Sequence, residues 1–409
     1  MMGLYTIIKF GYAIVVFSWL LMVWISLNEA KEMEGTQYPP CYFNPLCSCS
    51  KSIPDLGIVR CKDIHLPLIP QVINSSKVFM LYLENIGLRD IEPYFLQSTS
   101  LYKLCITKNL LTSVPEEAFL GLERSLWELN LSYNDLSTVP NKALRYLQKL
   151  RHLDLSGNDI IEIAPDDWRG LENSLEILML SNNAINSLPA DAFSGLPQLD
   201  TLDLSGNNLR EIDPSVFRDG MGKLTHVYLA DNQLSVIPYQ ALQPLKLLKY
   251  LDLSYNVINK MQAQIDQLNP ISHQEFDYDL SLDTLRLDYN QLTIMESAAF
   301  QHFDVLNKTY LDGNPLHEIQ ESAFVHAVIK ELYIRKCDLN DISPLAFGGL
   351  ENSLQILDLS GNNISSLPEE ILHRFNIIHT LVLGGNSIEN LDPIEFLSGL
   401  HLILSIPWF

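Results

Sequence analysis

The chain of 409 residues carries 27 Lys and Arg against 49 Asp and Glu, a formal net charge of −22 at pH 7. Nucleic acids and anionic membranes attract basic proteins, so this excess of acid disfavours both as partners. Hydrophobic residues make up 47% of the chain, which is enough to build a substantial core.

The start of the chain has the pattern of a secretory leader. An apolar run from Phe10 to Leu27 follows Lys9, and Ala30 stands shortly after it. A basic start, an apolar stretch and a small residue typify a signal peptide, so we assign residues 1–30 to one. The run is almost long enough to span a bilayer, and an uncleaved signal anchor is the alternative. Both interpretations send the chain into the secretory pathway.

The next segment, residues 31–77, holds four Cys with the spacing C-x5-C-x-C-x11-C: Cys41, Cys47, Cys49 and Cys61. In an oxidising compartment this cluster indicates two disulfides, although spacing alone leaves three connectivities open. A zinc site is the rival interpretation, and the leader argues against it. We expect an N-terminal cap that shields the core of the adjoining segment from water.

Residues 78–401 restate one phrase, Leu-x-x-Leu-x-Leu-x-x-Asn-x-Leu, thirteen times. Its first positions are Val78, Leu101, Leu126, Leu150, Leu175, Leu199, Leu224, Leu248, Leu282, Leu306, Ile329, Leu354 and Ile378. Successive starts lie 23 to 25 residues from one another, except for one step of 34 residues. This period and phrase are typical of leucine-rich repeats, so the predicted fold is an α/β solenoid, a horseshoe with a parallel sheet on its concave face.

Each unit, numbered from its first apolar residue, begins with a short strand. Apolar positions 1, 4, 6 and 11 are expected to point inward, while positions 2, 3 and 5 line the concave face. Asn stands at position 9 in eleven units, with Ile86 and Cys337 in the others, and its amide is expected to satisfy buried backbone groups. Position 19 predicts a buried spine on the convex side: Phe119, Leu144, Trp168, Phe193, Phe217, Leu242, Phe300, Phe324, Phe347 and Phe396.

The unit that begins at Leu248 is ten residues longer than its neighbours, with the extra length near residues 259–281. Insertions in solenoids form loops, and such a loop could bind a partner. Because added loop length costs little free energy, we favour a tolerated loop without a function.

Four Asn-x-Ser/Thr sequons are candidate glycosylation sites: Asn74, Asn130, Asn307 and Asn363. Asn130 and Asn307 occupy strand positions 5 and 2, where extended backbone disfavours transfer of the glycan. We therefore favour Asn74 and Asn363.

The sequence contains no catalytic or nucleotide-binding motif such as GxSxG, HExxH or a Walker loop, and it predicts no enzyme, cofactor or metal. His152 with Asp154 is the most catalytic-looking pair, and a solvated surface pair is the simpler interpretation. Asp154, Asp203 and Asp252 share position 5 on alternate units, about 10 Å apart, which is too far for a common calcium ion.

Aromatic residues gather at outward positions of five consecutive units: Tyr228, Tyr250, Tyr255, Tyr289, Tyr310 and Tyr333, with Arg286, Arg335 and Lys336 beside them. Tyr and Arg are enriched in protein interfaces, so we predict a protein-binding patch. The alternative is that Tyr is present simply because it favours strands.

Several strings resemble the chaoptin family of insect photoreceptor adhesion proteins. They are YPPC from Tyr38, DLGIVRCK from Asp55, SKVFMLYLENIGLRDIEPYFLQST from Ser76, GLERSLWELNL from Gly121 and SLQILDLSGNN from Ser353. These strings are far more specific than the generic repeat. The resemblance covers most of the chain after the leader.

The resemblance implies a glycosylated extracellular protein on the outer face of the photoreceptor plasma membrane, held by a glycosylphosphatidylinositol anchor. Its implied partner is another copy of itself on an apposed membrane, with no small-molecule substrate. Resemblance to caps of extracellular leucine-rich-repeat proteins pairs Cys41 with Cys49 and Cys47 with Cys61. It carries over no adhesion residues, so the tyrosine patch rests on this sequence alone.

The family continues through further repeats to an anchor signal, whereas this sequence ends at HLILSIPWF. We interpret residues 402–409 as the truncated start of a further repeat, without an anchor signal. The expectation is a truncated form that is secreted.

These patterns are compatible with two functions. The first is homophilic cell adhesion through the leucine-rich-repeat surface. The second is a receptor-type or secreted module that binds a different protein, and sequence alone does not separate the two because both use the same kind of exposed surface.

Overall fold

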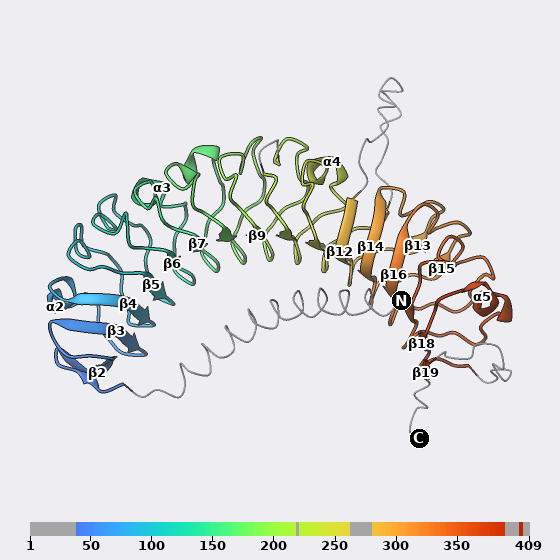
Figure 1. The fold of residues 1–409 in the computed structure, drawn as a ribbon, viewed down its shortest axis with the longest axis horizontal. Coiled ribbons are helices and arrows are strands. Elements are labelled where there is room, and N and C mark those ends of the chain that lie inside the picture. Colours follow the sequence, from blue (N-terminus) through green and yellow to red (C-terminus); the bar gives the residue numbers. More distant parts are fainter. Residues whose placement is uncertain (1–37, 218–220, 262–279, 389–400, 404–409) are drawn as a thin grey trace, which may run out of the picture.

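The computed structural model describes residues 38–217, 221–261, 280–388 and 401–403. These residues form a curved solenoid, with the strands along the concave side of the arc and short helices and turns along the convex side (Figure 1). The predicted leader, most of the insertion near 259–281 and most of the final segment 402–409 lie outside the described residues. The horseshoe predicted from the repeats is confirmed.

Seventeen of the described strands join into one sheet. They are β1 (Pro40–Cys41), β2 (Asn44–Cys49), β3 (Asp55–Lys62), β4 (Lys77–Glu84), β5 (Lys103–Thr107), β6 (Glu128–Asn130), β7 (His152–Asp154), β8 (Ile177–Met179), β9 (Thr201–Asp203), β10 (His226–Tyr228), β11 (Tyr250–Asp252), β12 (Leu280–Arg286), β14 (Phe303–Tyr310), β16 (Val328–Tyr333), β17 (Ile356–Asp358), β18 (Thr380–Val382) and β19 (His401–Ile403). From β3 onward all neighbours in this sheet are parallel. A separate pair is formed by β13 (Ile294–Met295) and β15 (Glu318–Ile319).

The parallel strands pair with equivalent positions in register. Thr201 pairs with His226 and His226 with Tyr250, all at position 3 of their units. Because this register is kept along the sheet, each position of the repeat becomes a row of side chains that runs along the solenoid. Residues that are 23 to 25 apart in sequence are therefore neighbours in space.

The convex side carries short helical turns and the predicted spine. The helices are α2 (Gln71–Asn74), α3 (Asn141–Leu144), the 3-10 turn η1 (Pro165–Trp168), α4 (Tyr239–Leu242) and α5 (Glu369–Arg374). Spine ring centres lie 6.1 Å apart in Trp168–Phe193 and Phe193–Phe217, 5.2 Å in Phe300–Phe324 and 6.0 Å in Phe324–Phe347. These rings are buried, so their assignment to the core is confirmed, while Phe396 lies outside the described residues.

The Asn residues at position 9 form a second ladder inside the turns. The Nδ2 of Asn207 donates to the carbonyls of Leu180 and Leu204 at 3.0 and 2.9 Å. Its Oδ1 accepts the N–H of Ile185 at 3.1 Å, so one amide ties two repeats together. Cys337 takes the same position in one unit, where its buried thiol lies 3.2 Å from two backbone carbonyl oxygens that share its single S–H donor. The structural role predicted for these amides is confirmed.

The cap is an antiparallel extension of the sheet. Strand β1 pairs with β2 and β2 with β3 in antiparallel fashion, and β3 then starts the parallel series. Disulfides join Cys41 to Cys49 and Cys47 to Cys61, with Cα–Cα distances of 5.0 and 4.4 Å. This is the pairing that the resemblance implies. In the part of the chain that the structure describes, every helix is too short or too polar to cross a bilayer.

Candidate protein-binding surface

The six tyrosines predicted to form one patch occur as three pairs in ring contact, one tilted at 39° and two stacked. Tyr228 and Tyr250 have ring centres 5.0 Å apart, Tyr255 and Tyr289 4.6 Å, and Tyr310 and Tyr333 4.6 Å. The first and third pairs lie on strands of the concave sheet. The second pair stands at position 8, beyond the ends of the strands. The structure therefore divides the predicted patch between the concave face and its edge.

Arg286 on β12, Tyr310 on β14, Tyr333 at the end of β16 and Arg335 just beyond that strand form a column that we call the Arg–Tyr ladder. The two rings are nearly parallel, at 7°. The Arg286 guanidinium lies 5.5 Å from the Tyr310 ring centre, and that of Arg335 lies 5.2 Å from the Tyr333 ring centre. A cation over an aromatic ring is attracted to its electron-rich face, so each member fixes its neighbour.

Two buried carboxylates hold the arginines in this column from below. Asp288 Oδ2 accepts from Arg286 Nε at 2.9 Å, and the Asp288 side chain is only 2% exposed. Asp312 Oδ2 accepts from Arg335 Nε at 2.8 Å. The backbone N–H of Asp312 donates to Asp288 Oδ1 at 3.1 Å. Both acids stand at position 7, where Ser is the commonest residue in this chain. An Asp in place of Ser at position 7 is the sequence signal that could have predicted the ion pairs with the two arginines.

Burial and hydrogen bonds shift the pKa values of the titratable groups in and beneath the Arg–Tyr ladder. Burial raises the pKa of the Asp288 carboxyl, and the adjacent Arg286 opposes that shift. The hydrogen bond to Asp312 raises the pKa of the Arg335 guanidinium. Burial also raises the pKa of Tyr333, whose hydroxyl donates to Glu331 at 2.9 Å. Both arginines therefore stay charged and the tyrosine neutral at physiological pH.

The ladder is a pre-organised surface. The Arg286 and Arg335 side chains remain 41% and 40% exposed although their positions are fixed by the buried acids. Binding usually costs free energy because interface side chains lose rotamer freedom, and side chains that are already ordered avoid much of that cost. Arranged in this way, Arg and Tyr can serve as the anchor of a protein interface.

The family of the chain is shown by its match to known sequences. A family model described as leucine rich repeat matches residues 99–160, 165–209, 199–258 and 327–388, more than half of the chain. The chain is a leucine-rich-repeat protein. It is chaoptin-like: Drosophila melanogaster chaoptin is 58% identical over 98% of this chain. The aligned part is 31% of the length of chaoptin, so this leucine-rich-repeat chain spans about a third of that relative.

Solved structures place the same fold in other leucine-rich-repeat proteins. A protein of Leptospira interrogans matches with a TM-score of 0.55 at 21% identity, over 84% of this chain and 94% of that one. Drosophila Toll, solved in complex with Spatzle, matches with a TM-score of 0.52 at 20% identity, over 80% of this chain and 50% of that one. At these identities the likeness concerns the fold alone.

A third aromatic feature of this leucine-rich-repeat chain was missed by the sequence analysis. Phe79, Tyr102 and Trp127 share position 2 of consecutive units, with ring centres 5.2 and 5.6 Å apart. Arg151 continues the row, with its guanidinium 4.3 Å from the Trp127 ring centre, and pairs with Glu176 at 3.1 Å. The signal was their spacing of 23 to 25 residues at an outward position.

The acidic side chains at position 5 close the ends of their strands. Asp154 Oδ1 accepts the N–H of Ser156 at 2.9 Å, and Asp203 accepts that of Ser205 at 2.9 Å. The second carboxylate oxygen of Asp154 accepts from Asn130 Nδ2 at 2.8 Å. On the same strand, burial lowers the pKa of His152. These bonds give the carboxylates a local structural role. No group of three potential metal ligands occurs among the residues that the structure describes.

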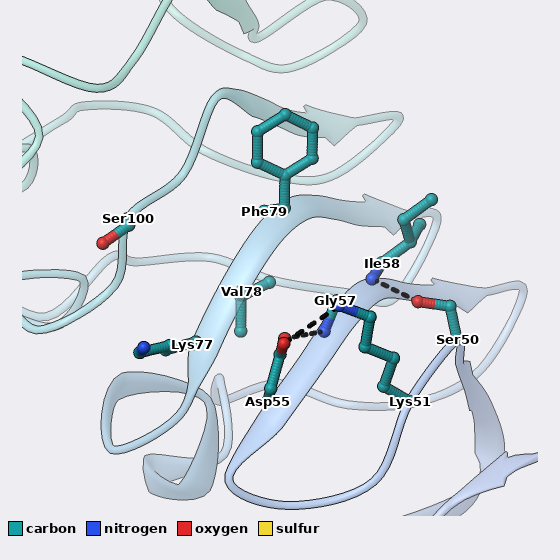
Figure 2. A pocket seen from close by; sticks show the side chains of 9 residues that line it. All are labelled: Ser50, Lys51, Asp55, Gly57, Ile58, Lys77, Val78, Phe79 and Ser100. Atoms are coloured by element: carbon teal, nitrogen blue, oxygen red, sulfur yellow. Dashed lines mark hydrogen bonds and ion pairs between the residues drawn. The ribbon is translucent and has the colours of Figure 1, made fainter.

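A pocket of about 430 Å³ lies where the cap meets the first repeat (Figure 2). The polar groups that the cap contributes are engaged with one another: Lys51 pairs with Asp55 at 3.0 Å, and Ser50 Oγ accepts the N–H of Ile58 at 2.8 Å. Asp55 also accepts the N–H of Gly57 at 3.1 Å. These contacts hold the turn between β2 and β3, so we interpret the pocket as part of the junction rather than as a ligand site.

Proposed function

We propose that the chain is the adhesive part of a chaoptin-like cell-surface protein and that it binds a second copy of itself through its leucine-rich-repeat surface. The observation that carries this proposal is the Arg–Tyr ladder, two exposed cations and two rings that buried Asp288 and Asp312 hold in place. Similarity to chaoptin supports an extracellular location on photoreceptor cells. The predicted leader and the two cap disulfides agree with that location.

A bead assay with the secreted chain tests self-binding. Beads coated with the chain are expected to clump without any added partner. Moderate salt should increase clumping, because two copies with a net charge of −22 repel at low ionic strength. Beads that stay dispersed at every salt concentration and instead capture a different protein would favour the receptor-type alternative.

The ladder makes the first specific prediction. Replacing Tyr310 and Tyr333 together by Ser should weaken self-binding roughly 30-fold, the effect of losing an interface anchor worth about 2 kcal/mol. The melting temperature should change little, because both rings lie on the surface of a sheet whose core is intact. Clumping and thermal unfolding are measured in parallel. Tyr42→Ser, at a cap residue that is 90% exposed, is the control and should leave both unchanged.

We also propose that the sequon residues Asn74, Asn130, Asn307 and Asn363 carry glycans, Asn307 among them although its strand position disfavours transfer. Support comes from Thr309, the hydroxyl residue of the Asn307 sequon. Thr309 is fully buried at position 4, where the other units carry Leu or Val, and its hydroxyl has no hydrogen-bond partner. A buried hydroxyl without a partner destabilises a core by about 1–3 kcal/mol. The need for a sequon accounts for a Thr at this position.

Replacing Thr309 by Leu should therefore raise the free energy of unfolding by about 1–3 kcal/mol and abolish the glycan at Asn307. Thr309→Ser keeps the sequon and should keep the glycan. Glycopeptide mass spectrometry and denaturant titration of the deglycosylated proteins measure the two effects. An unmodified Asn307 in the protein secreted from insect cells would contradict this proposal.

A further inference from the structure

We propose that two copies of this chain pack side by side through the edge of the solenoid that carries Tyr255 and Tyr289. We call the row at position 8 around this pair the Tyr edge; its members are Asp231, Tyr255, Tyr289, Gly313 and Lys336. The inference rests on the proposed self-binding and names a second surface for it, distinct from the Arg–Tyr ladder.

The backbone at the Tyr edge disfavours large side chains. Tyr255 and Tyr289 have φ of 55° and 53°, in the left-handed region. The same row carries Gly at 206, 313 and 361 and Asn at 182, residues that adopt this conformation more easily. A bulky residue held there lowers stability, and such strain concentrates at functional positions. Lys108, Tyr133, Asp231 and Lys336 share this conformation. What sets Tyr255 and Tyr289 apart is that they follow one another in the row and stack.

The two rings are exposed but ordered. They stack with centres 4.6 Å apart at 12°, and the residues remain 54% and 46% exposed. Tyr289 lies flat over Gly313, since a Cβ added to that glycine would come within 2.6 Å of the ring. The glycine thus leaves room for the ring to lie against the solenoid. Exposed, ordered aromatic area of this kind binds protein at a low entropic cost.

Charge and shape favour a second copy as the occupant. Asp231 and Lys336 are exposed at opposite ends of the row, and neither makes an ion pair within the described part of the chain. A twofold axis at Tyr289, the middle residue of the row, would place Asp231 of one copy opposite Lys336 of the other, twice. The solenoid is an arc viewed down its shortest axis (Figure 1), so its broad sides can lie against each other.

Asn variants test the tyrosines, because Asn already stands in this row and tolerates positive φ. Tyr255→Asn and Tyr289→Asn should leave the melting temperature equal or higher and raise the dissociation constant of the dimer at least tenfold. Tyr133→Asn is the matched control: Tyr133 has φ of 54°, is 54% exposed and lies over Gly157, but no tyrosine among the described residues stacks on it. Tyr133→Asn should change the melting temperature as the other two variants do, and its dimer dissociation constant should stay that of the unmodified chain. Dimer mass is measured by sedimentation velocity over a concentration series.

Charge reversal tests the symmetry. Asp231→Lys and Lys336→Asp should each weaken the dimer when alone, and an equimolar mixture of the two variants should restore it. Failure of the mixture, or equal loss in Tyr133→Asn, would overturn the side-by-side arrangement. If the unmodified chain neither dimerises nor clumps on beads, proposed self-binding fails as a whole. Clumping that persists in a chain with no dimer in solution would leave the ladder as the adhesive surface and remove the Tyr edge.

Discussion

Replacing Phe193 by Ala is expected to lower the free energy of unfolding by about 3–5 kcal/mol, the cost of removing a fully buried aromatic ring. Phe193 is 0% exposed and stacks between Trp168 and Phe217, each 6.1 Å away. Each repeat of a solenoid is stabilised mainly by its two neighbours, so a cavity at this point weakens two interfaces at once.

Because of that nearest-neighbour coupling, denaturation of the Phe193→Ala protein should separate into two transitions, one for each side of the cavity. Circular dichroism and hydrogen exchange in denaturant measure the loss and locate it. Leu247→Ala removes apolar atoms from a side chain that is 53% exposed and should change stability by no more than about 0.5 kcal/mol. A loss of similar size in both variants would contradict a structural spine.

Asn207→Ala should cost about 3 kcal/mol, almost as much as the loss of the ring. The substitution removes the amide that binds the carbonyls of Leu180 and Leu204 and the N–H of Ile185. These backbone groups are shielded from water, and each buried group left without a partner costs about 1–3 kcal/mol. The total cost is smaller than the sum over the three groups, because the turn can relax and water can enter to bind some of them.

The neighbouring Asn208 is exposed and provides a matched control, since Asn208→Ala changes the same residue type one position away. Denaturant midpoints of the two variants give the comparison. Equal midpoints would mean that the amides at position 9 contribute no more to stability than surface residues, which would contradict the structural role of the Asn ladder. Asn207→Cys should lie between the wild type and Asn207→Ala, because Cys337 fills the same position naturally, with its one S–H shared between two carbonyl oxygens.

The features that the sequence predicted best are those that every unit repeats. The spine and the Asn ladder each depend on a single position of the unit, the concave strands depend on the alternation of inward and outward positions, and most of the thirteen units keep these patterns. A solenoid converts such a pattern into rows, because its strands pair in register. The disulfide pairing, in contrast, came from resemblance, since spacing alone allowed three arrangements.

Features that one or two units carry were harder to predict. Tyr255 belonged with the other tyrosines by composition, whereas its position 8 places it outside the strands, in left-handed backbone. The supports beneath the Arg–Tyr ladder are two Asp that replace the commoner Ser at position 7, and a single sequence offers little reason to assign them a role. The row from Phe79 to Trp127 was missed because its members are three different aromatic residue types.

Self-binding through an ordered surface is the central claim, and a two-colour bead assay tests it most directly. Green beads carry the unmodified chain and red beads carry the Tyr310→Ser, Tyr333→Ser protein at the same density. We expect clumps made mostly of green beads, formed without any other protein, with red beads much rarer in them because only the Tyr edge is left to the red protein. Clumps that contain both colours equally would contradict the role of the ladder, and dispersed green beads would contradict self-binding itself.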